Sequence, residues 1–351
     1  MVRLYDISTW SPHPWLNTGG TRDKKFIQSP EGEYFFFKTS LLRPQKDYRY
    51  EFWNEIISFH LGQMLGFDTL KYELAIDGDK VGCLSKTMID NNIEDLNEGG
   101  KYLQAYDNSF DPELKELRAS YSFQLIEETL ISFQLETYMS NILEIIVFDA
   151  IIGNSDRHQE NWAFIIGLDN VGVLGITSIE RLIKYHYDKV PSWLKWILRF
   201  YKDKKENKLK KQFKDVQIGL SIPKSFAPIY DNGSSLGREL LDERLMKLDE
   251  DENLLYKYIK KGKSEIHWNN QKMDHFSLLK TLDTSKYSEP LKSIIKRVLN
   301  KYDSNKLDVI LNSLDVELVE QFSDYKIPPL RKRVIKKMID LRVSELKKLI
   351  D

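Results

Sequence analysis

An apolar run that ends in a polar turn constrains this chain most. Residues 142–152 are apolar apart from Glu144 and Asp149, and Gly153-Asn154-Ser155-Asp156-Arg157-His158-Gln159-Glu160-Asn161 follows them. An acid therefore stands five residues before an amide. This spacing is typical of a kinase catalytic loop, where the acid accepts or orients the proton of the attacking hydroxyl and the amide holds magnesium on the phosphates.

A second polar turn lies downstream. Tyr230-Asp231-Asn232-Gly233-Ser234-Ser235 follows the apolar and proline residues 227–229, and Asp231 stands where a second metal-binding acid belongs. Taken alone, an Asp-x4-Asn pattern is weak, and a Gly-Asn-x-Asp turn is commonly only a capped loop. The two turns in this order favour ATP- and Mg²⁺-dependent phosphoryl transfer.

Composition limits the class of protein without choosing a function. The length of 351 residues is enough for two lobes, and the net charge of −1 gives no global electrostatic case for nucleic-acid binding. The single cysteine, Cys83, excludes an intramolecular disulfide and a cysteine-based zinc site. Residues 1–30 lack a signal-peptide pattern, and no 18 consecutive residues are apolar, so we expect a cytoplasmic protein.

The hydrophobic pattern changes along the chain. Residues 32–38 predict an aromatic strand, 47–66 a helix, and 72–76 with 81–86 a hairpin. From about residue 112 helical patterns prevail. We therefore expect an α+β, two-lobed, protein-kinase-like fold, with a small β-rich lobe over 1–90 and a large helical lobe over 91–351. A hinge is expected near Thr87-Met88-Ile89-Asp90.

The N-terminal region offers groups that could bind phosphate. Residues 17–25, Asn-Thr-Gly-Gly-Thr-Arg-Asp-Lys-Lys, place glycines, hydroxyls and cations before a strand, although a Gly-Gly turn is more often a plain loop. Lys38 ends the aromatic strand and could reach phosphates, although most lysines are simply exposed. Glu51 and Glu55 lie one helical turn apart, so either could pair with Lys38 or belong to an acidic surface stripe.

Together these motifs resemble the HipA-like kinases, bacterial serine/threonine protein kinases with a two-lobed fold. The resemblance rests on Gly-Gly-Thr-Arg-x-Lys, a strand lysine, a helix glutamate before Leu-Gly, Gly-Asn-x-Asp-x-His-x-x-Asn and Tyr-Asp-Asn-Gly. It spans residues from about 15 to 350, and Gly153–Asn161 is its most specific part. It implies phosphorylation of serine or threonine in a protein substrate, including the chain itself, and a small DNA-binding, antitoxin-like partner of a toxin–antitoxin pair.

The resemblance also implies roles for single residues. Asp156 is the catalytic base, His158 orients it through hydrogen bonds and packing, and Asn161 and Asp231 hold Mg²⁺. Met88 lies where the hinge binds adenine through backbone groups. The remaining positions implied for ATP are Thr18, Gly19, Gly20, Thr21, Arg22, Lys24, Lys38 and the helix glutamate Glu55.

Three features depart from the family pattern. The glycine-rich loop begins near residue 17, which indicates the short, kinase-only form. About 70 residues separate Asn161 from Asp231, so residues 167–225 look like an insertion. Asn17 and Thr18 occupy the loop position near which some relatives carry a regulatory serine, and Thr18 and Thr21 are the candidate sites of autophosphorylation in this loop.

The insertion carries a basic, aromatic segment at residues 193–214. From Lys195 to Lys214 there are nine Lys or Arg residues against two acids, interleaved with tryptophan, phenylalanine and tyrosine. This segment could dock an acidic partner, tRNA or an anionic surface, while the simpler interpretation is an amphipathic helix with a solvated basic face. The basic residues of Arg331–Lys337 are interpreted as such a solvated face.

Three functions remain open from the sequence. The chain could be a protein kinase, a kinase of a lipid or small molecule, or a non-catalytic nucleotide-binding scaffold. The complete set of Lys38, Asp156, Asn161 and Asp231 argues against the scaffold, because a binding module does not need all four. The sequence does not separate the first two functions or identify the substrate.

Overall fold

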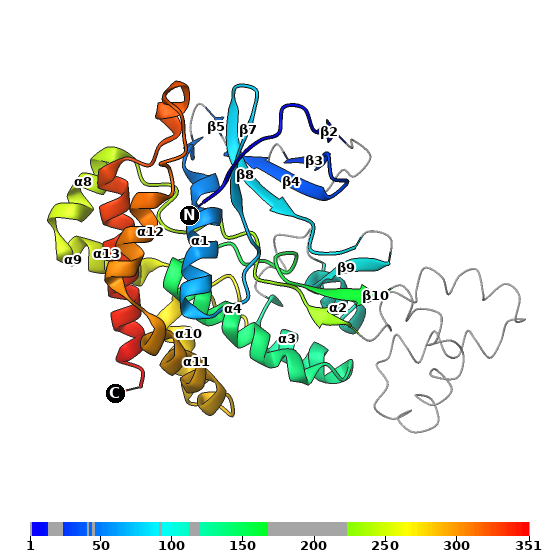
Figure 1. The fold of residues 1–351 in the computed structure, drawn as a ribbon. Coiled ribbons are helices and arrows are strands. Elements are labelled where there is room, and N and C mark those ends of the chain that lie inside the picture. Colours follow the sequence, from blue (N-terminus) through cyan, green and yellow to red (C-terminus); the bar gives the residue numbers. More distant parts are fainter. Residues whose placement is uncertain are drawn as a thin grey trace, which may run out of the picture.

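The computed structural model describes residues 2–12, 24–40, 42–43, 46–90, 93–111, 120–167 and 223–350, and it has a strand-rich and a helical part (Figure 1). Several predicted features lie outside these residues: Thr18, Gly19, Gly20, Thr21 and Arg22 of the glycine-rich loop, the basic segment 193–214, and nearly all of the insertion. The predicted boundary at residue 90 stays a prediction.

The N-terminal sheet has six strands in the order β1-β7-β8-β4-β3-β2. They are β1 (Leu4–Asp6), β2 (Ser11–Pro12), β3 (Lys24–Gln28), β4 (Tyr34–Thr39), β7 (Glu73–Asp77) and β8 (Lys80–Lys86). The predicted aromatic strand and hairpin are therefore present. The register pairs Lys38 of β4 with Lys24 of β3 and with Cys83 of β8. Directly opposed residues share a face, so two lysines project from the same side of the sheet.

One helix joins the sheet to the rest of the molecule. Helix α1 (Glu51–Leu65) contacts both β8 and β4 on one side and α11 and α12 on the other. It is buried over most of its circumference, as a helix between two layers must be. It begins four residues later than expected and ends at Gly66, whose φ of 79° only glycine adopts without strain.

Helices dominate the chain after β8. They are α2 (Gly99–Tyr106), α3 (Phe123–Ser132), α4 (Met139–Ile152), α8 (Asp242–Glu250), α9 (Glu252–Lys261), α10 (His275–Asp283), α11 (Ser288–Lys301), α12 (Ser304–Ser313) and α13 (Pro329–Lys347), with short 3₁₀ turns at Glu136–Tyr138 and Glu320–Tyr325. The apolar run seen in the sequence is α4, which is the buried centre of this region and contacts α10, α11 and α13. None of the described helices has the length and apolar character needed to cross a membrane.

Two small sheets complete the described part of the chain. Strands β5 (Leu42–Arg43) and β6 (Lys46–Asp47) pair with each other. A three-stranded sheet has the order β11 (Ser225–Phe226), β10 (Ala163–Gly167), β9 (Glu94–Glu98). Strand β10 directly follows the predicted catalytic loop and β11 directly precedes the predicted metal turn, so their pairing brings the two turns together.

The C-terminal helix corrects one prediction. Arg331 was expected on a solvated basic face, but it is buried and donates hydrogen bonds to the carbonyls of Gly237 and Leu240. Its guanidinium also lies 4.8 Å from the centre of the Tyr50 ring. Helical spacing shows which residues share a face, but it does not show that a loop will cover a cation on that face.

Candidate active site

Five of the residues predicted from the motifs meet in one cluster. The Nζ of Lys38 lies 3.2 Å from Oδ1 of Asp231 and 3.5 Å from Oε1 of Glu55. The hydroxyl of Ser234, three residues after Asp231, donates to Oδ2 of Asp156 at 3.0 Å. The amide of Asn161 donates to the Asp156 carbonyl at 2.8 Å. The fold thus joins a strand, a helix and two loops that are far apart in the sequence.

The structure decides which glutamate partners Lys38. Glu55 is 2% exposed, and its second oxygen accepts the backbone N–H of Asn232 at 2.7 Å. Glu51, one turn earlier, forms an ion pair with Arg238 instead. Burial alone would lower the pKa of Lys38, but the negative charges of Asp231 and Glu55 act in the opposite direction, and that pKa lies well above its ordinary value. Lys38 is therefore a permanently charged group at physiological pH.

The metal turn is held in an uncommon backbone conformation. Asp231 has a φ of 56°, in the left-handed region that costs a non-glycine residue about 1 kcal/mol or more. Helix α1 fixes the turn from one side, because the Asn54 amide donates to the carbonyls of Gly233 at 3.2 Å and Ser235 at 2.7 Å. The Ser235 hydroxyl donates to the Asn232 carbonyl at 2.6 Å. Such strain, held by its surroundings, is common at functional sites.

The catalytic loop begins where α4 ends. Gly153 terminates the helix with a φ of 68°, and a side chain here would collide with the buried guanidinium of Arg342. The Asn154 amide donates to Asp149 at 3.2 Å, while its oxygen accepts the Asp156 N–H at 3.1 Å. These bonds set the direction in which Asp156 leaves the helix.

Arg157 is a central residue that the sequence analysis missed. It is 1% exposed, and its Nη2 lies 2.9 Å from Oδ1 of Asp149. It also donates to the carbonyls of Asn161 and Tyr230, and to Oδ1 of Asn232 at 2.6 Å. One side chain therefore ties α4, the catalytic loop and the metal turn together.

The electrostatics of this pair follow from its burial. Burial raises the pKa of Asp149, while the Arg157 guanidinium and its hydrogen bonds act in the opposite direction. Asp149 and its hydrogen bonds hold the pKa of Arg157 above its ordinary value, against the opposing effect of burial. The signal for this role was present in the sequence, since a cation inside the loop motif and an acid inside an apolar helix both need a buried partner.

An apolar surface lies next to the predicted hinge residues. Ala163, Ile165 and Ala227 are buried together, and Met88, Ile89, Leu96 and Tyr230 pack against them partly exposed. In the described part of the chain nothing hydrogen-bonds the Met88 carbonyl or the Ile89 N–H. Free backbone groups beside an apolar surface suit a purine base, which needs stacking area and an edge partner. Of these residues the sequence indicated only the hinge.

Lys24 supplies a second cation on the same face. Its Nζ lies 4.4 Å from the centre of the Phe36 ring. Burial of its ammonium and repulsion by Lys38 lower the pKa of Lys24 to about 8, against the attraction of Asp231, Glu98 and Glu55. Lys24 as a whole is exposed to solvent, and its ammonium interacts electrostatically with Lys38, Asp231 and Glu55. Two lysines of this kind can bind a polyanion such as a triphosphate.

The predicted metal ligands fit Mg²⁺. Because the Asn161 Nδ2 is engaged by the Asp156 carbonyl, its Oδ1 is left as an acceptor, and Asp231 adds a carboxylate. No group of three His, Cys, Asp or Glu side chains placed to hold a metal ion occurs in the described ranges. Magnesium on a nucleotide needs only one or two protein oxygens, because phosphates and water complete its shell.

His158 is not placed as expected. Within the described ranges it makes no hydrogen bond to Asp156, whose carboxylate is instead held by Ser234. Its Nδ1 lies 3.4 Å from the backbone nitrogen of Glu160 and 3.9 Å from that residue's carboxylate. An orienting role through hydrogen bonds is therefore not seen, and any other role for His158 stays a prediction.

Comparison with solved structures identifies the fold. A crystal structure of the Helicobacter pylori proinflammatory kinase CtkA superposes with a TM-score of 0.71, covering 99% of this chain and 98% of that chain at 15% identity. The chain has a kinase fold. The two-lobed, protein-kinase-like fold predicted from the sequence is thus confirmed, and an identity of 15% shows the fold alone.

Other comparisons are weaker. A chain of the Shewanella oneidensis MR-1 toxin–antitoxin complex of HipA, HipB and operator DNA matches with a TM-score of 0.47, at 11% identity over 97% of this chain and 66% of that chain. A Golgi casein kinase gives 0.39, at 12% identity over 99% and 72%. Scores this low carry no argument. No protein-family model and no curated protein sequence matches the chain.

Proposed function

We propose that this protein is an ATP- and Mg²⁺-dependent kinase that transfers the γ-phosphoryl group to serine or threonine hydroxyls of a protein. The observation that carries the proposal is the position of Lys38 between Glu55 and Asp231. A lysine held by a helix glutamate, beside an acid that can bind metal, is the arrangement that positions nucleotide phosphates in protein kinases.

Different residues of the proposed site would bind different parts of the nucleotide. Lys38 and Lys24 would contact the phosphates, while the Met88 carbonyl and the Ile89 N–H would bind the adenine edge above Ala163 and Ile165. Asn161 and Asp231 would hold magnesium, which when bound neutralises charge on the phosphates. Thr18, Gly19, Gly20, Thr21 and Arg22 remain proposed ATP-binding positions in the glycine-rich loop.

Asp156 would act on the acceptor. Its Oδ2 is held by Ser234, and its backbone is fixed by Asn154 and Asn161. The carboxylate would align the hydroxyl of the substrate and accept its proton as the bond to phosphorus forms. Positioning and charge stabilisation supply most of the rate in this chemistry, so a rigidly held base is a consistent feature.

The choice of a protein substrate rests on the motif resemblance. The same fold can carry a kinase of a lipid or small molecule. The deciding experiment is transfer of labelled phosphate from ATP, with Mg²⁺, to the protein itself, to other proteins, to lipid headgroups and to small metabolites. Label on serine or threonine that is absent with Asp156→Asn supports the proposal, whereas label only on lipid or metabolite would refute the protein-kinase assignment.

Partners and self-control belong to the same proposal. The resemblance favours a small DNA-binding, antitoxin-like partner, and the basic segment 193–214 could dock an acidic protein, tRNA or an anionic surface. A phosphate on Thr18 or Thr21 would place about −1.5 to −2 charges beside those of ATP and lower ATP affinity. Mass spectrometry after incubation with ATP and Mg²⁺, against Asp156→Asn, tests this; unmodified threonines in active protein would exclude the switch.

A further inference from the structure

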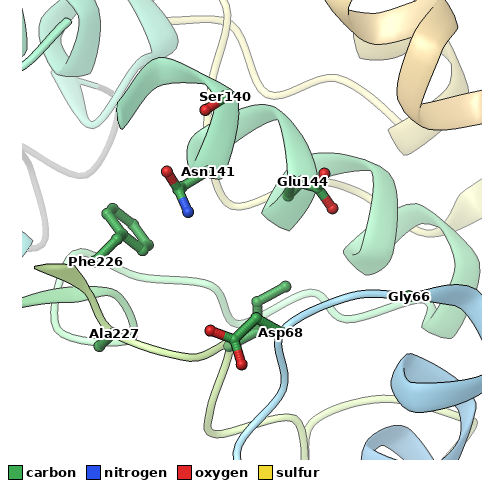
Figure 2. Close-up of a pocket in the computed structure, with 8 residues that line it drawn as sticks. Gly66, Asp68, Ser140, Asn141, Glu144, Phe226 and Ala227 are labelled. Carbon is green, nitrogen blue, oxygen red and sulfur yellow. The ribbon is translucent and has the colours of Figure 1, made fainter. Parts of the chain in front are cut away.

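A cavity lies behind the metal turn, between the two parts of the fold. It has a volume of about 210 Å³ and is lined by Gly66, Asp68, Ser140, Asn141, Glu144, Phe226, Ala227 and Ile229. Figure 2 shows Asn141, Glu144, Phe226 and Asp68 around the same space, contributed by α4, β11 and the segment after α1. Because Asp68 and Ser140 are exposed, the cavity opens to solvent at these residues.

The cavity adjoins the segment that carries Asp231. The backbone N–H of Ile229 donates to the Asp68 carbonyl at 2.8 Å, and the Leu70 N–H donates to the Ile229 carbonyl at 2.9 Å. These two bonds form a short parallel bridge between Thr69 and Ile229. Asp231 follows two residues later, so one wall of the cavity is continuous with the metal turn.

One carboxylate at the cavity has no partner among the described residues, and an ammonium also lies nearby, because the Nζ of Lys301 stands beside Gly66. Arg297 neutralises Glu144 through two hydrogen bonds, of 2.7 and 2.5 Å. Asp68, by contrast, has no hydrogen-bond or ion-pair partner for its carboxylate in the described portion of the chain. Partial burial raises the pKa of Asp68. Because Asp68 as a whole is exposed at the mouth of the cavity, a ligand cation can reach its carboxylate.

Two further features define the complementary ligand. The Asn141 side chain makes no hydrogen bond to another described residue, so its amide can bind a ligand beside Asp68. The base of the cavity is apolar, because Phe226 and Ile229 are both buried. An alkyl chain would cover this surface, and a cation near an aromatic face gains additional attraction.

Other ligand classes fit less well. An anion would meet the unpaired charge of Asp68. A hard metal ion needs about six oxygen ligands, whereas the carboxylate of Glu144 is held by Arg297 and few other oxygens line the cavity. The volume is also below the roughly 300 Å³ at which pockets for drug-sized molecules begin, which limits the ligand to a few non-hydrogen atoms.

We propose that this cavity binds a small organic cation, an alkylammonium or alkylguanidinium. Its charged head lies at Asp68 and Asn141, and its alkyl chain lies against Phe226 and Ile229. The proposal does not depend on the kinase activity, because none of these residues belongs to the ATP or metal site proposed above.

The test uses the full chain without nucleotide and follows binding of n-butylammonium and agmatine by calorimetry and NMR titration. We expect saturable binding in the millimolar range. Uncharged n-butanol, which has the same alkyl chain, should bind about five-fold more weakly, since a partly exposed charge pair contributes on this order. Absence of saturable amine binding, or equal binding of n-butanol, would overturn the proposal.

Variants locate the site. Asp68→Asn keeps the shape and the backbone carbonyl, and it should weaken amine binding about five-fold. Asn141→Asp adds a second carboxylate and should strengthen it. Asp79→Asn, in the exposed β7–β8 turn, serves as a matched control and should behave like the wild type. Unchanged affinity in both Asp68→Asn and Asn141→Asp would place the amine elsewhere and overturn the assignment.

Discussion

Two ion-pair systems meet at the metal turn, and they differ in their access to water. Lys38, Asp231 and Glu55 form the first, with side chains of Lys38 and Asp231 that are 14% and 26% exposed. Arg157 and Asp149 form the second, with side chains only 1% and 5% exposed. Both systems contact the turn that carries Asp231, at its side chain in the first case and at its backbone and Asn232 in the second.

This difference in exposure determines which of the side-chain contacts a bound ligand can replace. Phosphates and magnesium can take the places of the Lys38 and Asp231 contacts, because both side chains reach solvent. The guanidinium of Arg157 donates its hydrogen bonds to protein atoms. Removal of this side chain would therefore leave the buried Asp149 carboxylate and two backbone carbonyls without their partner. We expect the accessible system to govern nucleotide binding and the buried system to govern the stability of the site.

The largest expected effect comes from the buried system. Arg157→Leu should lower the free energy of unfolding by about 3–5 kcal/mol, because the Asp149 charge is left unpaired. Urea unfolding measures the loss. The double variant Asp149→Leu/Arg157→Leu should lose less than the single variant, since no charge remains buried. Arg333→Leu is the control and should cost under about 1 kcal/mol, because the Arg333 side chain is 57% exposed in its ion pair with Asp249. If Arg157→Leu lowered the free energy of unfolding by no more than Arg333→Leu does, the proposed difference between the buried and the accessible ion pairs would be wrong.

The next largest effect is expected on phosphoryl transfer, from a change at the proposed catalytic base Asp156. Asp156→Asn keeps the shape of the side chain and should leave ATP binding largely intact, while phosphoryl transfer falls by at least ~10²-fold. Single-turnover transfer of labelled phosphate and nucleotide titration measure the two quantities separately. Asp79→Asn is the matched control at an exposed turn. Full activity in a correctly folded Asp156→Asn protein would exclude Asp156 as the base.

Within the accessible system, Asp231 and Lys38 should contribute to nucleotide affinity in different ways, Asp231 through magnesium and Lys38 through the phosphates. Asp231→Ala should abolish the magnesium-dependent part of nucleotide affinity. Lys38→Ala should weaken binding at any magnesium concentration, by about 2 kcal/mol, the contribution of a hydrogen bond to a charged group. Calorimetry with and without Mg²⁺ distinguishes the two. The same magnesium dependence in wild type and Asp231→Ala would show that Asp231 is not a ligand.

The smallest effect is a pH dependence at Lys24. Its pKa is lowered to about 8 by burial and by Lys38, and only the protonated ammonium attracts phosphate. Nucleotide affinity should therefore be full below pH 8 and fall as the pH rises through 8, by at most about ten-fold per pH unit. Lys24→Arg should flatten this profile, because guanidinium stays charged. A profile unchanged by Lys24→Arg would mean that another group titrates.

The sequence predicted the local structural elements of this protein and their order. The aromatic strand, the hairpin, the helix before Gly66 and the strand-rich to helical order are short-range features, set by side-chain periodicity and turn residues. The positions of Lys38, Asp156, Asn161 and Asp231 were readable because a catalytic loop needs particular residues at fixed spacing. The structure brings these four into one cluster of contacts with Glu55 and Ser234.

Contacts between distant segments were decided only by the tertiary structure. Glu51 and Glu55 are equivalent in helical spacing, but packing turns Glu55 to Lys38 and Glu51 to Arg238. The sequence analysis assigned no role to Arg157 and placed Arg331 on a solvated face, whereas both are buried once β10 pairs with β11 and α13 packs against α8. The sequence gives the chemical type of each side chain, and residue spacing shows which side chains share one face of a helix or strand. The burial of a charged group, and with it the group's contribution to stability, depends on segments that lie between 75 and 193 residues away in the contacts of Arg157 with Asn232 and of Lys38 with Asp231.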